Sequence, residues 1–95
     1  MITHVILFRL KDRGRGNIEK VRDMLVSLSG AVPSVRSLEA GIDVLHLPRS
    51  YDIALTVRFD DMAGLDEYQK HPAHVAVAVC VKEASDAVVS VDYES

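Results

Sequence analysis

The segment Ile2–Lys11 constrains the fold most, because it alternates like a β-strand yet is apolar on both of its faces. In an extended chain, Ile6 and Phe8 point to one side, whereas Val5 and Leu7 point to the other. A strand of this kind belongs to a sheet that is covered by helices on one side and by something else on the other. The sequence therefore predicts a sheet in which neither face of the first strand is left to water.

The rest of the chain supplies further strands and helices in a recognisable order. The patterns predict a helix capped by Asn17 and ended by Gly30, strands over Ser37–Leu47 and Asp52–Phe59, a short helix that Pro72 ends, and a final strand over 87–94. The stretch "HVAVAVCVKEA" is ambiguous, because its valines alternate as in a strand. A cap at His71, a proline in the first helical position and several alanines favour a helix instead.

This order of elements is that of a ferredoxin-like α+β fold, a four-stranded antiparallel sheet with helices on one face only. No internal repeat, linker or low-complexity tract interrupts the chain, so residues 1–95 are expected to form a single domain.

The apolar content of the chain predicts a homodimer. Hydrophobic residues make up 48% of the 95 residues, which is more than one small core can bury. We expect the helix-free face of the sheet to carry His4, Ile6 and Phe8, together with the Ile53–Phe59 row or its opposite. Because that face is too apolar for water, a second copy is expected to pack against it with two-fold symmetry.

Charge and cysteine content narrow the classes of partner and compartment. The net charge of −3, with no basic stripe, argues against a nucleic-acid partner. No stretch is long and apolar enough to span a bilayer, and "MITHVILFRLK" lacks the basic start and cleavage site of a signal peptide. The single Cys80 fits a reducing compartment. We therefore expect a cytoplasmic protein that binds neither nucleic acid nor membrane.

Several stretches together resemble the stress-responsive A/B barrel domain family (Dabb), a branch of the dimeric α+β barrel superfamily. They are "ITHVILFRLK", "VPSVRSLEAGID", "DIALTVRFDDMAGLDEYQKHPAHVAV" and the closing "VDYE", which cover nearly the whole chain. The resemblance implies a dimer whose two sheets face each other to form a barrel, with a pocket beside or within each sheet.

Some relatives in this family are polyketide cyclases, which close a ring by intramolecular aldol chemistry. The resemblance to them implies that Tyr68, before the H-P-x-H motif, and His74, its second histidine, carry the chemistry. It also implies that His4 lines the same cavity. Some of those cyclases carry a further histidine where this chain has Ile53, so the chain departs from their pattern at this position.

Each candidate residue has a structural interpretation beside the functional one. His71 fits a helix cap, Tyr68 fits a core residue, and His4 fits a satisfied core histidine. The functional interpretation is supported because the predicted fold can bring His4, Tyr68 and His74 to one cavity. An imidazole is a natural base for a proton alpha to a carbonyl, and a tyrosine hydroxyl can donate to the developing oxyanion.

The sequence thus predicts Tyr68 and His74 as catalytic residues of a pocket for a small hydrophobic ligand. The expected binding residues are His4, Ile6, Phe8, Ile53, Phe59 and His71. The H-P-x-H motif offers at most two metal ligands, whereas zinc normally takes three or four, so we expect no metal and no cofactor. The alternative is a non-catalytic, stress-responsive protein that binds a ligand or has a structural role.

Overall fold

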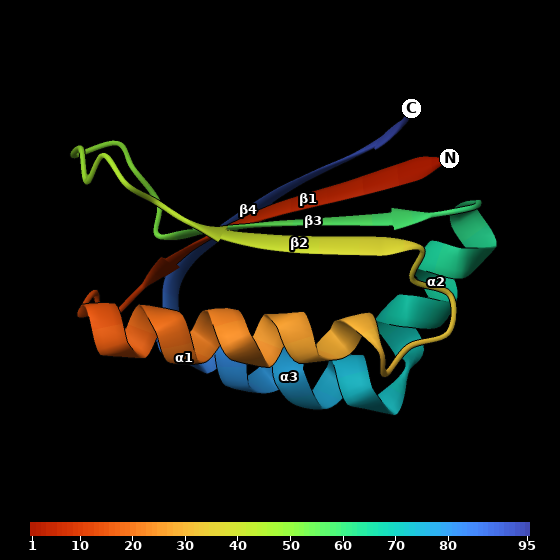
Figure 1. Cartoon of the computed structure of the whole chain (residues 1–95), viewed down its shortest axis with the longest axis horizontal. Helices are drawn as coiled ribbons and strands as arrows, with labels where there is room; N and C mark the ends of the chain where they lie inside the picture. The colour runs from red at the N-terminus through yellow and green to blue at the C-terminus, as the bar shows by residue number, and fades with distance from the viewer.

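The computed structural model describes all residues, Met1–Ser95, as one sheet covered on one face by helices (Figure 1). In chain order the elements are β1 (Ile2–Leu10), α1 (Arg15–Val26), a 3₁₀ turn (Ser27–Ser29), β2 (Ser37–Ile42), β3 (Ile53–Phe59), α2 (Met62–Lys70), α3 (Pro72–Ala84) and β4 (Ser85–Glu94). The predicted ferredoxin-like fold with helices on one face is confirmed. The ambiguous valine-rich stretch is helical, as the cap and proline signals favoured.

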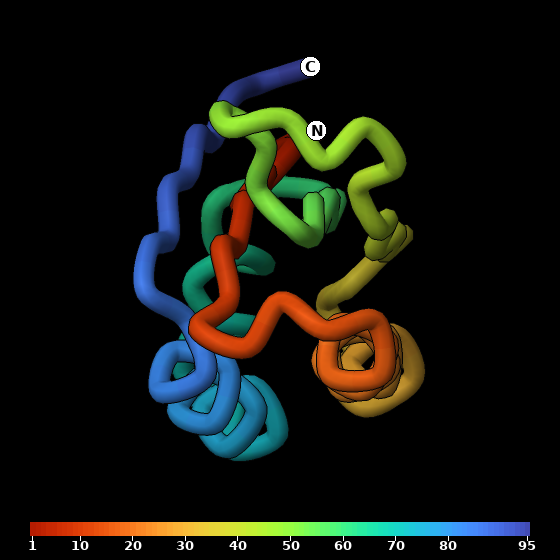
Figure 2. The backbone as a smooth tube through the Cα atoms, turned by 90° about the vertical axis from the view of Figure 1, so that its left-hand side faces the viewer, coloured from red at the N-terminus to blue at the C-terminus, as the bar shows by residue number.

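The sheet has the strand order β2-β3-β1-β4, and every neighbouring pair is antiparallel. Strand β1 is therefore central, and β4 forms one edge. His4 lies opposite Val57 on β3 and opposite Asp92 on β4. Figure 2 shows α1 and α3 side by side beneath the sheet, with β4 above α3. None of the helices has the length and apolar composition needed to cross a bilayer.

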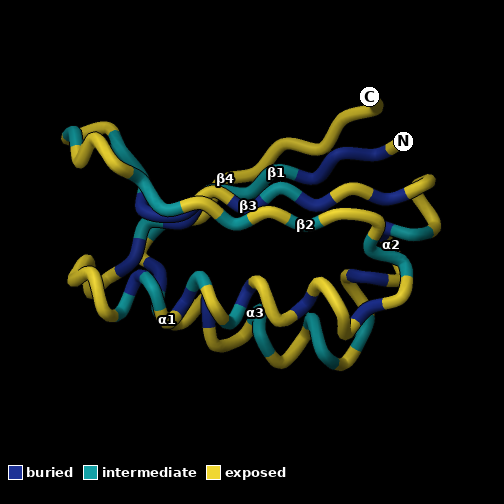
Figure 3. The backbone as a smooth tube through the Cα atoms, in the orientation of Figure 1, coloured by how far each residue is buried: buried dark blue, intermediate teal, exposed yellow.

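The hydrophobic core lies between the sheet and the helices, where Figure 3 shows most of the buried backbone. Alternate side chains of β1 and β3 meet the apolar stripe of α1 there. The buried cluster consists of Ile2, Phe8, Leu10, Ile18, Val21, Leu25, Leu28, Val32, Ile53, Leu55, Val57, Phe59, Leu65, Tyr68 and Val81.

The face assignment predicted for the first strand is wrong. His4, Ile6 and Phe8 point toward the helices, and so do the Ile53, Leu55, Val57 and Phe59 side chains of β3. Two-residue periodicity shows which side chains share a face, but both faces of β1 are apolar, so periodicity does not say which face the helices cover.

The helix-free face carries the opposite set of side chains. Val5 and Leu7 of β1 lie beside Val91 and Val89 of β4, and Tyr93 follows on the same strand. Val91 is 57% exposed and Val89 is 47% exposed. This face is therefore still apolar and unpartnered in the single chain, so the physical reason for expecting a dimer holds with different residues.

Three element boundaries differ by two residues or more from the sequence-based expectation. Helix α1 begins two residues before Asn17, whose side-chain amide donates to the Asp12 carbonyl instead of serving as the cap. Strand β2 ends at Ile42, because Asp43 turns the chain and its carboxylate accepts from the His46 backbone N–H. The final strand begins at Ser85, directly after α3.

Candidate functional site

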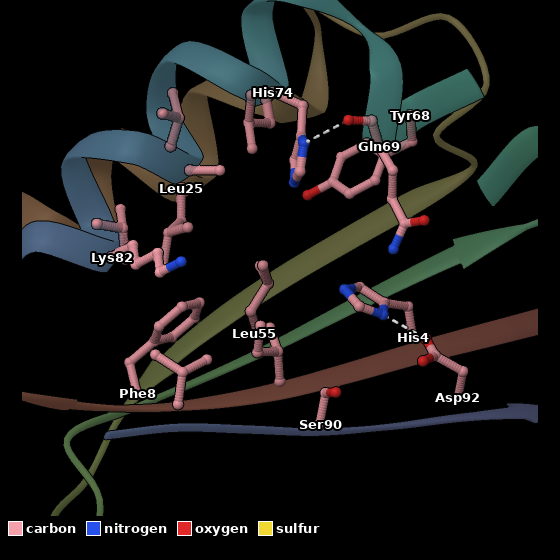
Figure 4. Close-up of a pocket in the computed structure, with 16 residues that line it drawn as sticks. His4, Phe8, Leu25, Leu55, Tyr68, Gln69, His74, Lys82, Ser90 and Asp92 are labelled. Carbon is pink, nitrogen blue, oxygen red and sulfur yellow. Dashed lines mark hydrogen bonds and ion pairs between the residues drawn. The ribbon is translucent and has the colours of Figure 1, made fainter. Parts of the chain in front are cut away.

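A cavity of about 380 Å³ lies between the sheet and the helices (Figure 4). Its lining comes from strands β1, β3 and β4, from all three helices and from the 3₁₀ turn. Ten of the 16 lining residues are hydrophobic, so the walls suit an apolar molecule. The lining consists of His4, Ile6, Phe8, Leu25, Leu28, Leu55, Tyr68, Gln69, His74, Val77, Ala78, Val81, Lys82, Val88, Ser90 and Asp92.

The break between α2 and α3 brings Tyr68 and His74 together. His71 ends α2 and caps α3, because its Nδ1 accepts from the backbone N–H of Ala73 at 3.1 Å. Pro72 then occupies the first turn of α3, where its missing N–H leaves no bond unmade. The chain turns at this point, so Tyr68 and His74 come from two different helices with ring centroids 4.3 Å apart.

Tyr68 is held in the core with its hydroxyl at the cavity wall. The residue is 1% exposed, and its ring centroid lies 5.1 Å from that of Phe59. Burial raises the pKa of Tyr68 to about 12, because the phenolate would lose its hydration. The hydroxyl therefore stays protonated at neutral pH and is available as a hydrogen-bond donor toward the cavity.

The hydrogen bonding of His74 defines which ring nitrogen is free. Its Nδ1 lies 3.2 Å from the Gln69 carbonyl oxygen, which can only accept, so Nδ1 carries the hydrogen. Nε2 is then the unprotonated nitrogen of the neutral ring. Burial lowers the pKa of His74, which favours this neutral form, although the Gln69 bond opposes the shift. His74 thus presents a basic nitrogen in an apolar setting.

A second histidine faces the same space from the sheet. His4 is 7% exposed, and its ring centroid lies 6.3 Å from that of Tyr68. Its Nδ1 contacts the carboxylate of Asp92, the residue opposite it on β4. Because a carboxylate accepts, this contact orients the ring with Nδ1–H toward Asp92 and Nε2 toward the cavity (Figure 4).

The other predicted binding residues divide into two groups. Ile6 and Phe8 line the cavity with His4, Tyr68 and His74. Ile53 and Phe59 do not; they lie in the core at the ends of β3, 2% and 0% exposed, and only Leu55 between them reaches the cavity. His71 does not line it either, because its ring is used in capping α3.

Sequence reasoning missed several polar residues of the lining. Asp92 and Ser90 come from β4, Gln69 follows Tyr68, and Lys82 lies two turns beyond His74 on α3. The alternation of "VVSVDYE" was a signal that Ser90 and Asp92 share a face, but their neighbours depend on strand register. No group of three or more histidine, cysteine, aspartate or glutamate side chains is placed to hold a metal ion.

Fold and site together define a small ferredoxin-like α+β domain with a polar cluster at one end of an apolar cavity. A family model described as "Stress responsive A/B Barrel Domain" matches residues 2–95. The chain therefore belongs to the stress-responsive A/B barrel domain family, as its sequence motifs indicated. No curated protein matches the sequence significantly.

Solved structures show the same fold. A dimeric ferredoxin-like protein of unknown function from Thermobifida fusca is 28% identical, with a TM-score of 0.87 over 99% of this chain and 90% of that chain. An Arabidopsis thaliana protein is 26% identical, also with a TM-score of 0.87, over 100% and 95% of the two chains. A hydroxynitrile lyase from Passiflora edulis is 18% identical, with a TM-score of 0.83 over 97% and 90%.

Proposed function

We propose that the cavity binds a small, largely apolar carbonyl compound and removes a proton from the carbon next to the carbonyl. This proton transfer is the step from which aldol-type ring closure proceeds. One observation carries the proposal: the His74 imidazole and the Tyr68 phenol come from two helices to adjacent positions on one wall, with ring centroids 4.3 Å apart.

The two side chains have complementary roles in this step. Nε2 of His74 takes the α-proton, and the electron pair of the broken C–H bond moves into the carbonyl group to give an enolate. The Tyr68 hydroxyl donates a hydrogen bond to the enolate oxygen and stabilises its charge. Both assignments follow the directions of the two pKa shifts, since the imidazole is favoured in its neutral form and the phenol in its protonated form.

The remaining walls suit the binding of such a substrate. Ile6 and Leu55 offer apolar surface that keeps water from the reacting carbon, and Phe8 extends this surface away from the reacting groups. His4, oriented by Asp92, can accept a hydrogen bond from a substrate hydroxyl through Nε2. The Passiflora edulis neighbour is a hydroxynitrile lyase, but at 18% identity it is similar in fold alone and gives no substrate for this chain.

The proposed proton transfer can be tested without the natural substrate. Acetophenone is apolar, and its methyl protons are the only ones alpha to its carbonyl, so their exchange in heavy water reports the step directly by NMR. We expect the protein to accelerate this exchange and His74→Ala to abolish the acceleration. Tyr68→Phe should slow it by roughly 10²–10³-fold, the usual effect of losing one oxyanion donor.

His46→Ala is the matched control, because this histidine has a 68% exposed side chain on the β2–β3 connection, away from the cavity lining. It should leave the exchange rate unchanged. If the unmodified protein does not accelerate exchange although acetophenone shifts the resonances of the lining residues, the non-catalytic binding function replaces this proposal. Unchanged exchange in His74→Ala would refute the role of that imidazole.

We further propose that the chain works as a homodimer joined through the helix-free face of the sheet. The related protein from Thermobifida fusca is described as dimeric, and so are ferredoxin-like proteins from Bacteroides fragilis and from a Jannaschia species. Exposed Val89, Val91 and Tyr93, beside Val5 and Leu7, supply the apolar surface that a second copy would cover. In this arrangement each chain keeps its own cavity on the opposite side of its sheet.

A further inference from the structure

Lys82 lies at the end of the cavity opposite the two histidines and Tyr68. It follows His74 by eight residues on α3, which is about 12 Å along the helix axis. On the sheet side of the cavity, His4 and Phe8 are four residues apart on β1, or about 13 Å. Figure 4 shows His4 and Tyr68 at one end and Lys82 with Phe8 at the other. The cavity is therefore elongated and has two chemically different ends.

The Lys82 ammonium has no partner within the chain. Eight ion pairs involving other residues are present, including Lys70 with Asp66, but none includes Lys82 and no hydrogen bond engages its side chain. Phe8 lies at the same end of the cavity (Figure 4), and Val88 lies opposite Phe8 on β4, so the wall at this end is apolar. A cation beside apolar walls, with its donors free, is suited to an anionic group of a bound molecule.

The opposite end of the cavity carries the opposite charge. The Asp92 carboxylate lies there against His4, so an anionic group entering at that end would meet a negative charge. Ile6, Leu55 and Ala78 separate the two ends with apolar surface. The charges thus orient a ligand that has one anionic end.

We propose that the cavity selects an elongated organic anion with an apolar body, whose carboxylate pairs with Lys82 while its other end lies at Tyr68 and His74. This inference rests on the proposed function, because it assigns the carbonyl end of the substrate to the reacting groups. It adds the substrate class: an apolar carboxylic acid held by its acid group at the Lys82 end of the cavity. Because Lys82 is exposed, the bound carboxylate stays partly hydrated. The preference for an anionic over a neutral ligand is therefore moderate.

The test compares binding of decanoate with binding of decanamide, which has the same chain without the charge, by titration calorimetry and NMR. We expect decanoate to bind about tenfold more tightly at low salt, which corresponds to about 1.4 kcal/mol. Lys82→Met should remove this difference and leave the affinity for decanamide within about twofold. Lys82→Arg should restore the preference, because a guanidinium also pairs with carboxylate. At about 1 M salt the preference should shrink, since the Debye length falls to about 3 Å.

Two controls locate the effect in this cavity. Lys20→Met removes an exposed lysine of α1 that is not part of the lining, so the preference for decanoate should persist. Ala78→Trp places a bulky ring between the two ends of the cavity and should abolish binding of both compounds. Melting curves of each variant establish that it is folded.

The possible results separate this inference from the proposed function. Equal affinity for the two compounds, a preference that survives in Lys82→Met, or no binding of either at millimolar concentration would overturn the role of Lys82. None of these results affects the acetophenone exchange, because acetophenone has no acid group. Conversely, if the unmodified protein prefers decanoate but does not accelerate acetophenone exchange, the catalytic role is refuted and the anion site stays in place.

Discussion

Val91→Asp is expected to convert the proposed dimer into monomers. Val91 lies in β4 on the helix-free face and is 57% exposed in the single chain, next to Val5 on β1. Two-fold symmetry brings the same residue of both chains into the interface, so the substitution lowers the association free energy once for each chain. The substitution does not touch the cavity, because residues at adjacent positions in a strand point to opposite faces.

The magnitude follows from burial and charge. Fully burying a valine side chain contributes about 1.5–3 kcal/mol, and Val91 has roughly half of its surface left to bury, which gives about 1 kcal/mol. An unpaired carboxylate in an apolar contact costs at least about 2 kcal/mol more. Two copies then lose about 6 kcal/mol of association free energy, which raises the dimer dissociation constant by about 10⁴.

Light scattering and sedimentation over a concentration series measure this directly. The unmodified protein should have a mass of about 21 kDa, twice the 10.5 kDa chain, and Val91→Asp should have the mass of one chain at micromolar concentration. Val79→Asp is the matched control, because Val79 is 53% exposed on the outer side of α3. A dimer that survives Val91→Asp but is split by Val79→Asp would place the interface on the helices and refute the reasoning. A charge at Phe8 would be uninformative, since Phe8 is buried inside the chain.

Four further expectations concern the site. Burial lowers the pKa of His74, so the exchange rate should stay level from neutral pH down to about 6.5, the ordinary imidazole value, and fall only below it. Below about pH 6.5 the unfolded chain binds a proton at His74 more readily than the folded chain does. The free energy of unfolding should therefore decrease as the pH falls. In denaturant titrations, His74→Gln should weaken this pH dependence. For Tyr68 the pKa is raised on folding, from the ordinary 10.0 to about 12. The free energy of unfolding should therefore decrease as the pH rises from about 10 to 12, and this decrease should be smaller in Tyr68→Phe. Elemental analysis of untagged protein should find no stoichiometric zinc, iron or copper; one such ion per chain would contradict the expectation drawn from the H-P-x-H motif.

Element order was predictable because each segment has a distinct period. The stripe of Ile18, Val21 and Leu25 indicates a helix, and the alternation over Ile53–Phe59 indicates a strand, whatever surrounds them. The side of the sheet on which the helices pack was not predictable from β1, which has apolar residues in both registers. Which face of β1 the helices cover depends on packing between segments far apart in the sequence, and a local pattern does not contain that information.

The residues of the candidate site that were predictable are those close together in the sequence, and those brought in by strand pairing were not. Tyr68 and His74 are close in sequence, and the His71–Pro72 break that joins their helices is visible in the sequence itself. Asp92 contacts His4 across 88 residues, so its position depends on how β4 pairs with β1. Ile53 and Phe59 share a face with Leu55, but they do not line the cavity, and a face pattern does not show which of its members reach a cavity.

Strand β4 has consequences for how this chain tolerates insertions and deletions. Its even-numbered positions, Ser90 and Asp92, face the cavity, while Val89 and Val91 between them face away from the helices. Deleting one residue within the strand would exchange the two sets, turning valines inward and a carboxylate toward the apolar face. Deleting two residues would keep the alternation and shorten the strand. Related chains should therefore vary in the length of this edge strand by pairs of residues, and single-residue changes should be confined to its ends.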